Sequence, residues 1–188
     1  MLITISGSPG SGKSTLAKEL TQKLGYKFHS VGDLRRAIAK KRGLTLAEYN
    51  HWSETHKSGD IFVDRAVRRL GEKNDNLIVE GRLAWHFIPQ SMKIFLYLDT
   101  AEGAKRIWSS YAQDQDKRNE DSIASLADLK ESLEKRVASD RLRYKKYYNL
   151  DIFDKKHYDL WLDVGPFNKK QEFDAVWGEI KNRLTPPK

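Results

Sequence analysis

A short apolar run followed by a glycine-rich turn constrains the fold of this chain more than any other feature. The apolar run LITIS begins at Leu2 and suits a buried parallel strand. The turn after it, GSPGSGKS from Gly7 to Ser14, matches G-x-x-x-x-G-K-[ST]. From Thr15 to Leu24 apolar residues recur at helical spacing and end at a glycine, as expected for a helix with a C-terminal cap. A strand, a glycine-rich loop and a helix in this order predict a nucleoside triphosphate site.

The residue types in this loop suit a polyphosphate. Its glycines allow backbone N–H groups to point inward at phosphate oxygens, and the helix adds its positive N-terminal end. Lys13 is expected to reach the β- and γ-phosphates, and the Ser14 hydroxyl to ligate Mg²⁺. The predicted triphosphate-binding residues are Gly7, Ser8, Pro9, Gly10, Ser11, Gly12, Lys13, Ser14 and Thr15.

Short apolar runs alternate with helical patterns along the rest of the chain. Further strands are predicted at Tyr26–Val31, Leu77–Glu80, Lys93–Leu98 and Tyr158–Val164. Further helices are predicted at Asp33–Arg42, Leu46–Thr55, Asp60–Lys73, Ala101–Ala112, Leu126–Tyr148 and Lys169–Leu184. This alternation is typical of an α/β fold, a parallel sheet with helices on both faces. The 188 residues contain no repeat, low-complexity tract or long linker, so we expect one domain.

Composition limits the chemistry, the partners and the cellular compartment that we expect for this chain. The chain has no cysteine, which excludes a disulfide framework, thiol catalysis and cysteine-ligated metal sites. Its 34 Lys and Arg against 26 Asp and Glu give a net charge of +8, so an anionic partner is expected: a nucleotide, a nucleic acid or an anionic membrane. No apolar stretch approaches the roughly 18 residues of a membrane span, and the first strand leaves no room for a signal peptide. The expected compartment is the cytoplasm.

The loop also narrows the class of protein. A GTPase would need N-K-x-D for guanine, and the nearest string, Asn168–Gln171, ends in glutamine. A large motor or ATPase usually needs a longer chain. A small P-loop kinase is therefore the simplest prediction.

Such a kinase needs arginines to hold two polyanions close together. The turn VGDLRR places Arg36 one turn into a helix, at the sheet edge where ligands bind in open α/β folds. In LIVEGR, Glu80 ends a buried strand and Arg82 follows it. Glu80 is a candidate to position Mg²⁺ or its water; the alternative is a cap or an ion pair with Arg82.

Two further sets of arginines come later in the chain. Arg136, Asp140 and Arg143 are spaced i, i+4 and i+7, so they share one face of the long helix. This spacing fits an acceptor site, although by itself it favours a solvated, salt-bridged surface. Arg106 and Arg118 flank a polar stretch where a closing lid would bring cations over the transferring group; ordinary exposed arginines are an equal alternative.

Together these strings resemble the short archaeal-type cytidylate kinases, from the first strand to about Asp163. The resemblance is carried by GSPGSGKSTLAKEL, VGDLRR, RGLTLAEYN, VEGRLAWHFIP and RVASDRLRYKKYYNLDIFDKKHYDLWLD, of which the last is the most particular. It implies a P-loop nucleoside monophosphate kinase fold with a five-stranded parallel sheet. It also implies Mg²⁺-dependent transfer of the ATP γ-phosphate to CMP or dCMP. The single kinase domain, residues 1–188, would have a core (1–30, 77–112 and 126–184), an NMP-binding insertion at about 31–76 and a lid at about 113–125.

Position by position, the resemblance implies roles for several residues. The P-loop from Gly7 to Thr15 would bind ATP, with Ser14 and Glu80 at the metal. The acceptor would be held by Arg36, Arg82, Arg136, Asp140 and Arg143. The catalytic cations would be Lys13, the lid arginine Arg106, Arg136 and Arg143. One of Asp60 and Asp64 would accept a hydrogen from the cytosine 4-amino group; otherwise both are ordinary acids of a helix surface.

Some positions depart from the pattern of bacterial cytidylate kinases. Leu83 stands where they have aspartate and Val31 where they have serine or threonine, and both positions are expected near the base. Trp85 and Phe87 either wall the base pocket or pack in the core, with core packing favoured.

Two alternatives to a CMP or dCMP kinase stay open. In the first, the protein is a kinase whose acceptor is UMP, AMP or another small metabolite. In the second, it is a nucleotide-dependent RNA-associated factor that uses its basic residues. Nucleic acid is the less favoured partner, and a monomer is expected.

Overall fold

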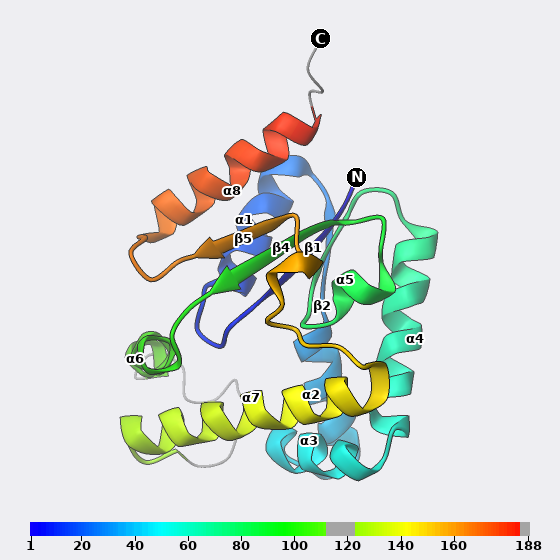
Figure 1. The fold of residues 1–188 in the computed structure, drawn as a ribbon, viewed down its shortest axis with the longest axis vertical. Coiled ribbons are helices and arrows are strands. Elements are labelled where there is room, and N and C mark those ends of the chain that lie inside the picture. Colours follow the sequence, from blue (N-terminus) through cyan, green and yellow to red (C-terminus); the bar gives the residue numbers. More distant parts are fainter. Residues whose placement is uncertain (112–122, 185–188) are drawn as a thin grey trace.

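A computed structural model describes residues 1–111 and 123–184 (Figure 1). The strands are β1 (Leu2–Gly7), β2 (Lys27–Ser30), β3 (Leu77–Glu80), β4 (Met92–Tyr97) and β5 (Leu160–Asp163). The helices are α1 (Lys13–Leu24), α2 (Val31–Lys41), α3 (Leu46–Thr55), α4 (Ser58–Lys73), α5 (Ala84–Phe87), α6 (Thr100–Tyr111), α7 (Leu126–Tyr148) and α8 (Lys169–Leu184), with a short 3₁₀ helix η1 (Lys155–His157). Most bounds lie within two residues of those predicted; α5 and η1 were not predicted.

The five strands form one parallel sheet in the order β2-β3-β1-β4-β5. In its register Ile5 of β1 lies beside Glu80 of β3 and Ile94 of β4. All carboxyl ends therefore meet at one edge, and the central strand β1 delivers the glycine-rich loop there. The predicted α/β class with a five-stranded parallel sheet is confirmed.

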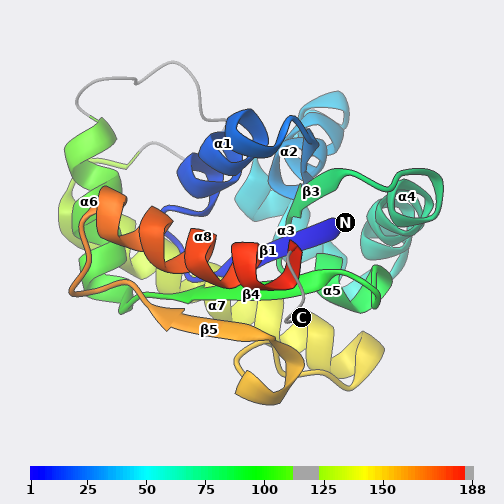
Figure 2. The same cartoon turned by 90° about the horizontal axis from the view of Figure 1, so that it is seen from above.

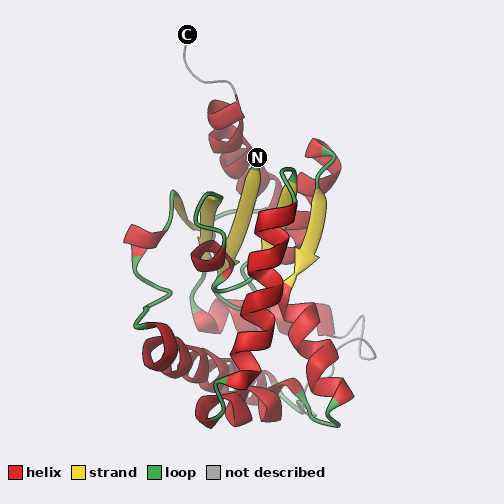
Figure 3. Cartoon of the chain, turned by 90° about the vertical axis from the view of Figure 1, so that its right-hand side faces the viewer, coloured by secondary structure: helices red, strands yellow, loops and turns green. Residues whose placement is uncertain are grey.

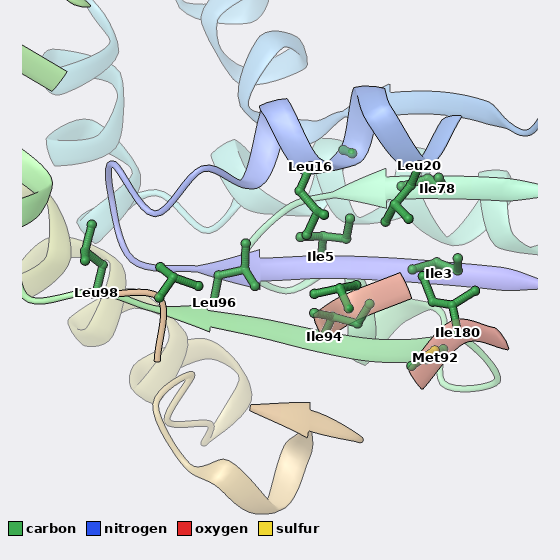
Figure 4. Close-up of a cluster of buried hydrophobic side chains, with 13 residues drawn as sticks. Ile3, Ile5, Leu16, Leu20, Ile78, Met92, Ile94, Leu96, Leu98 and Ile180 are labelled. Atoms are coloured by element: carbon green, nitrogen blue, oxygen red, sulfur yellow. The ribbon is translucent and has the colours of Figure 1, made fainter. Parts of the chain in front are cut away.

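Alternate residues of β1 feed two hydrophobic cores, one on each face of the sheet. Ile3 and Ile5 pack with α1 and α8, through residues such as Leu20 and Ile180 (Figure 4). Leu2 faces the opposite core, which α4 and α5 supply. Figure 2 shows α1 and α8 on the same side of the sheet, and helices on both sides of the strands are visible in Figure 3. The loop is thus mounted on a strand that is buried on both faces.

The long helix α7 runs crosswise beyond the carboxyl ends of the strands, where it packs against α3 and α6 (Figure 1). It brings residues far along the chain to the edge where β1 ends. In the described parts of the chain no helix is both long and apolar enough to cross a membrane.

Candidate functional site

The glycine-rich loop is shaped by glycines at two left-handed backbone positions. Gly10 has a φ of 74° and Gly12 a φ of 86°, which side chains rarely adopt. A β-carbon at Gly10 would also lie 2.5 Å from the carbonyl oxygen of Gly103, so α6 packs directly on the loop. The loop leads into α1, whose N-terminus has no side-chain cap. The first N–H groups of α1 are therefore available to an anion.

Lys13 is folded back over this loop. Its Nζ donates to the carbonyl oxygen of Ser8 at 2.6 Å. Burial lowers the pKa of Lys13 to about 8, although Glu80 acts in the opposite direction. A half-buried ammonium group beside this loop is suited to bind phosphate oxygens, because a bound anion would offset its charge.

Ser14 and Glu80 form a pair of oxygen donors beside the loop. The Ser14 hydroxyl donates to Glu80 Oε2 at 2.9 Å. Oxygen donors of this kind are the ligands that Mg²⁺ prefers, so these residues fit the metal site predicted for them. The alternative ion pair of Glu80 with Arg82 is not what the structure contains, since Arg82 pairs elsewhere.

Next to the loop lies a buried cluster of three arginines and two aspartates. Asp60 Oδ1 accepts hydrogen bonds from Arg35 and, at 2.6 Å, from Arg143. Asp140 in turn binds Arg143 through Oδ1 and Arg82 Nε through Oδ2, the latter at 2.9 Å. The side chain of Arg143 is 0% exposed. A solvated surface, which spacing alone favoured for Arg136, Asp140 and Arg143, is therefore wrong for the last two, which are buried in ion pairs with Asp60 of α4 and Arg82.

The cluster holds more hydrogen-bond donors than it uses. Three guanidinium nitrogens and one carboxylate oxygen in it are buried without a partner among the described residues: Arg35 Nε, Arg82 Nη1, Arg143 Nε and Asp60 Oδ2. Cations are the groups that bind phosphate most strongly, and Arg35 and Arg82 of this cluster also line a pocket. A phosphate group placed there, close to Lys13, would lie in the positive field of the cluster.

The charges of the cluster reinforce one another. Burial alone would raise the pKa of Asp140, but Arg82 and Arg143 outweigh it and hold that pKa below its usual range. Burial likewise opposes the charge of Arg143, yet Asp140 and Asp60 raise its pKa above the ordinary value. Both groups stay ionised at neutral pH. Arg136, half-buried one turn before Asp140, adds a positive charge that acts on both Asp140 and Lys13.

A small pocket, partly open to solvent, begins at this cluster. It is lined by Val31, Arg35, Asp60, Val63, Asp64, Val67, Arg82, Leu83, Ala84, Phe87 and Tyr144. Val31 and Leu83, which were expected to lie near a base, are both in this lining. Trp85 instead packs in the core, 6% exposed, with its indole N–H bonded to the Arg82 carbonyl.

Asp64 lies in the same pocket, one helical turn from Asp60. The hydroxyl of Tyr148, on α7, donates to Asp64 Oδ2. Burial raises the pKa of Asp64 to about 6, even though the Tyr148 hydrogen bond lowers it. Asp60 and Asp64 are thus both in the pocket rather than on a plain helix surface.

Arg36 and Arg106, both predicted site residues, lie outside the arginine cluster and outside the pocket lining. Arg36 pairs with Asp33 at 2.6 Å on the surface of α2, close to Gly32. Arg106 donates to the carbonyl oxygens of Val164 and Gly165, at 3.0 and 3.1 Å, and so is directed to the loop after β5. The predicted lid lies, except for its last three residues, outside the described residues, and so does Arg118.

Sequence reasoning missed Arg35 and Tyr148. Arg35 donates to Asn50 Oδ1 at 3.0 Å as well as to Asp60, whereas the residue predicted from the sequence was its neighbour Arg36. The available signal was helical period: Arg35 shares a face of α2 with Ala39, which is buried. No local signal marks Tyr148, whose partner is 84 residues away.

Comparisons with known proteins agree with this geometry. A family model described as the cytidylate kinase-like family matches residues 2–166. The cytidylate kinase of Methanothrix thermoacetophila is 41% identical over 181 residues, which are 96% of this chain and 98% of that protein. The cytidylate kinase of Archaeoglobus fulgidus is 35% identical over 94% of this chain and 92% of its own length.

Solved structures share the fold at lower identity. An uncharacterised protein from Eubacterium ventriosum has a TM-score of 0.68 at 16% identity, covering 96% of this chain and 98% of that one. Shikimate kinase from Acinetobacter baumannii has a TM-score of 0.59 at 15% identity, covering 98% and 95%. These likenesses establish the architecture alone.

Proposed function

Since the chain belongs to the cytidylate kinase-like family, we propose that it transfers the γ-phosphoryl group of ATP to CMP or dCMP, giving ADP and CDP or dCDP. The observation that carries this proposal is the cluster of arginines held by Asp60 and Asp140 beside the glycine-rich loop, at a pocket that Arg35 and Arg82 line. A loop for one polyphosphate and a cationic cluster for a second phosphate, adjacent to a pocket with apolar walls, are what a nucleoside monophosphate kinase requires.

The first step is binding of ATP along residues Gly7 to Thr15. The backbone N–H groups of the loop and the N-terminus of α1 hold the phosphates, and Lys13 neutralises charge that builds on the transferring group. Ser14 and Glu80 would hold Mg²⁺, which offsets the negative charge of the β- and γ-phosphates when bound. These residues are all attached to β1 and β3, which are neighbours in the sheet.

The acceptor phosphate is held by Arg82, Arg143 and Arg35, with Arg136 completing the positive field toward Lys13. Asp140 and Asp60 fix the guanidinium rotamers of these arginines, so the donors are oriented before the acceptor arrives. Arg36 stays a prediction as a further phosphate ligand and Arg106 as a lid arginine. Transfer occurs in line between two bound phosphates and needs no strong general base.

The same proposal divides the chain into working parts. Helices α2, α3 and α4 form the acceptor-binding insertion of about residues 31–76, because Arg35, Asp60 and Asp64 come from it. Residues of about 113–125 form the lid. The rest forms the nucleotide-binding core.

The test is the rate of ADP formation from ATP and Mg²⁺ with CMP, dCMP, UMP, AMP and GMP offered separately. We expect strong stimulation by CMP and dCMP and weak stimulation by the others. Stimulation by a different acceptor would replace CMP in the proposal and keep the kinase. The absence of stimulation by all five, with salt-sensitive RNA binding, would favour the RNA-associated alternative.

A further inference from the structure

The three tyrosines of α7 differ in what their hydroxyl groups bind. Tyr148 donates to Asp64 Oδ2, and Tyr147 donates to two backbone carbonyls of α3. The hydroxyl of Tyr144 has no hydrogen bond within the described part of the chain, and protein does not enclose it. Tyr144 is nevertheless only 7% exposed. A phenol buried to this extent usually has a partner for its hydroxyl.

The open side of this hydroxyl is the pocket beside the arginine cluster. Tyr144 lines that pocket together with Arg35 and Arg82. The guanidinium of Arg143 lies over its ring, with Cζ 5.2 Å from the ring centroid. The ring is thus held on the arginine cluster while its oxygen borders the pocket.

The charges around Tyr144 are those of the arginine cluster. Burial raises the pKa of its phenol to about 12; Asp140 acts in the same direction, and three arginines of the cluster act in the opposite one. The hydroxyl therefore keeps its proton at neutral pH and can donate a hydrogen bond. Burial is the main cause of the low pKa of Lys13, and Arg82 contributes to it. This end of the pocket therefore faces the phosphate-binding loop.

We propose that the Tyr144 hydroxyl donates a hydrogen bond to a phosphate oxygen of the acceptor nucleotide. This inference rests on the proposed function and adds a neutral donor to the arginines that hold the acceptor. A phosphate group has three strong acceptor oxygens, so it can accept from guanidinium groups and from a hydroxyl together. A hydrogen bond from a hydroxyl to an anionic oxygen is charge-assisted and stronger than one between neutral groups.

Tyr144→Phe removes this one oxygen and keeps the ring. We expect the KM for CMP to rise about tenfold or more, as is typical when a hydrogen bond to a charged group is lost. The KM for ATP should not change, and kcat should stay within a few-fold of wild type. The KM for UMP should rise by the same factor, because both nucleotides carry the same phosphate. The inhibition constant of cytidine, which has no phosphate, should stay at its wild-type value.

Stability separates this role from a structural one. The Tyr144 hydroxyl has no partner to lose among the described residues, so Tyr144→Phe without ligand should keep or raise the thermal midpoint of unfolding. The matched control is Tyr147→Phe, on the same helix, whose hydroxyl binds its two carbonyls outside the pocket lining. This control should keep the wild-type KM for CMP and lower the midpoint.

Several results would overturn the proposal. A wild-type KM for CMP in Tyr144→Phe would mean that the hydroxyl does not contact the acceptor. Unequal losses for CMP and UMP would assign the hydroxyl to the base, and weaker inhibition by cytidine would assign it to the nucleoside. A lowered midpoint with a higher KM for ATP, or a failure of Tyr144→Phe to fold, would indicate a structural role.

Binding measurements keep this proposal apart from the proposed function. If wild type does not phosphorylate CMP, the proposed function fails, and calorimetric titration of CMP and cytidine into wild type and Tyr144→Phe judges Tyr144. A loss of affinity for CMP alone supports the phosphate contact, and equal affinities of the two proteins for CMP overturn it. If wild type does not bind CMP, both proposals are wrong.

Discussion

At the scale of single residues, the charges of the site are tuned by what each group is buried against. Lys13 is bonded to the carbonyl oxygen of Ser8, and burial depresses its pKa, so its charge is incompletely satisfied. The guanidinium of Arg143, in contrast, has two carboxylate partners that outweigh its burial. Lys13 therefore stands ready for a ligand phosphate, whereas Arg143 is already part of the protein's own ion network.

Lys13→Ala should abolish turnover while leaving the fold intact. The variant loses a cation placed to stabilise charge on the transferring group, so kcat should fall by about a hundredfold or more. Lys18→Ala, which removes an exposed lysine of the same helix, is the control and should keep wild-type turnover. The measurement is kcat with ATP and CMP together with the thermal midpoint of unfolding; normal turnover would contradict the assignment of the site.

At the scale of elements, α7 connects the proposed acceptor site to the rest of the molecule. One face of this helix carries Arg136, Asp140, Arg143 and Tyr144, and its last turn adds Tyr148. Through these side chains the helix bonds α4 and the turn after β3, and it packs on α3. Its buried ion pairs link elements that are distant in sequence, so removing one partner would leave a charge buried without its counterpart.

The main effect of Arg143→Ala should therefore be a lower free energy of unfolding, with weaker binding of CMP as a second effect. It leaves Asp60 and Asp140 buried without their shared cation, and breaking a buried pair typically costs about 3–5 kcal/mol. Variant molecules that do fold should have a higher KM for CMP and an unchanged KM for ATP. Arg141→Ala, on the same helix, removes an exposed pair with Asp151 and should cost at most about 1 kcal/mol. Urea unfolding compares the two, and equal free energies of unfolding would refute the network's role.

At the scale of the whole molecule, the last helix closes over the first loop. Val176 and Ile180 of α8 pack in the same core as Leu16 and Leu20 of α1. The carboxylate of Glu172, buried in the first turn of α8, lies against Gly12, where a β-carbon would be 2.9 Å from its Oε1. The C-terminal helix thus places a titratable group behind the phosphate-binding loop.

The stability of the protein should depend on pH through Glu172. Burial raises its pKa from 4.5 to about 7, although Arg106 and Lys13 act in the opposite direction. Between these two pKa values the carboxyl group is protonated in the folded protein and ionised in the unfolded chain. Its ionisation therefore reduces the free energy of unfolding as pH rises from about 4.5 through about 7.

Glu172→Gln removes this titration. Relative to wild type, the variant should gain about 1–3 kcal/mol in free energy of unfolding between pH 5 and pH 8, since one pKa unit corresponds to about 1.4 kcal/mol. The difference in free energy of unfolding between variant and wild type cancels the contribution of groups that titrate in both proteins, such as Asp64. Denaturant unfolding at the two pH values measures it, and a difference that stays constant with pH would contradict the prediction.

Local patterns in the sequence determined the element order, the α/β class and the phosphate loop. The end of α1 was predictable because the glycine after it, Gly25, takes a left-handed φ of 68°, which glycine adopts without strain. The loop was predictable because its chemistry lies within nine consecutive residues. Such features depend on backbone geometry and periodicity, which are encoded locally.

Tertiary structure alone decided which charges meet. Adjacent arginines on α2 differ in role because the helix turns about 100° per residue, so Arg35 faces Asp60 while Arg36 pairs with Asp33 at the surface. The burial of Arg143 depends on the angle at which α7 crosses the strand ends. The contact of Asp64 with Tyr148, across 84 residues, depends on the same packing. The spacing of residues in the sequence does not predict that angle, because it is set by how the side chains of several elements fill a common core.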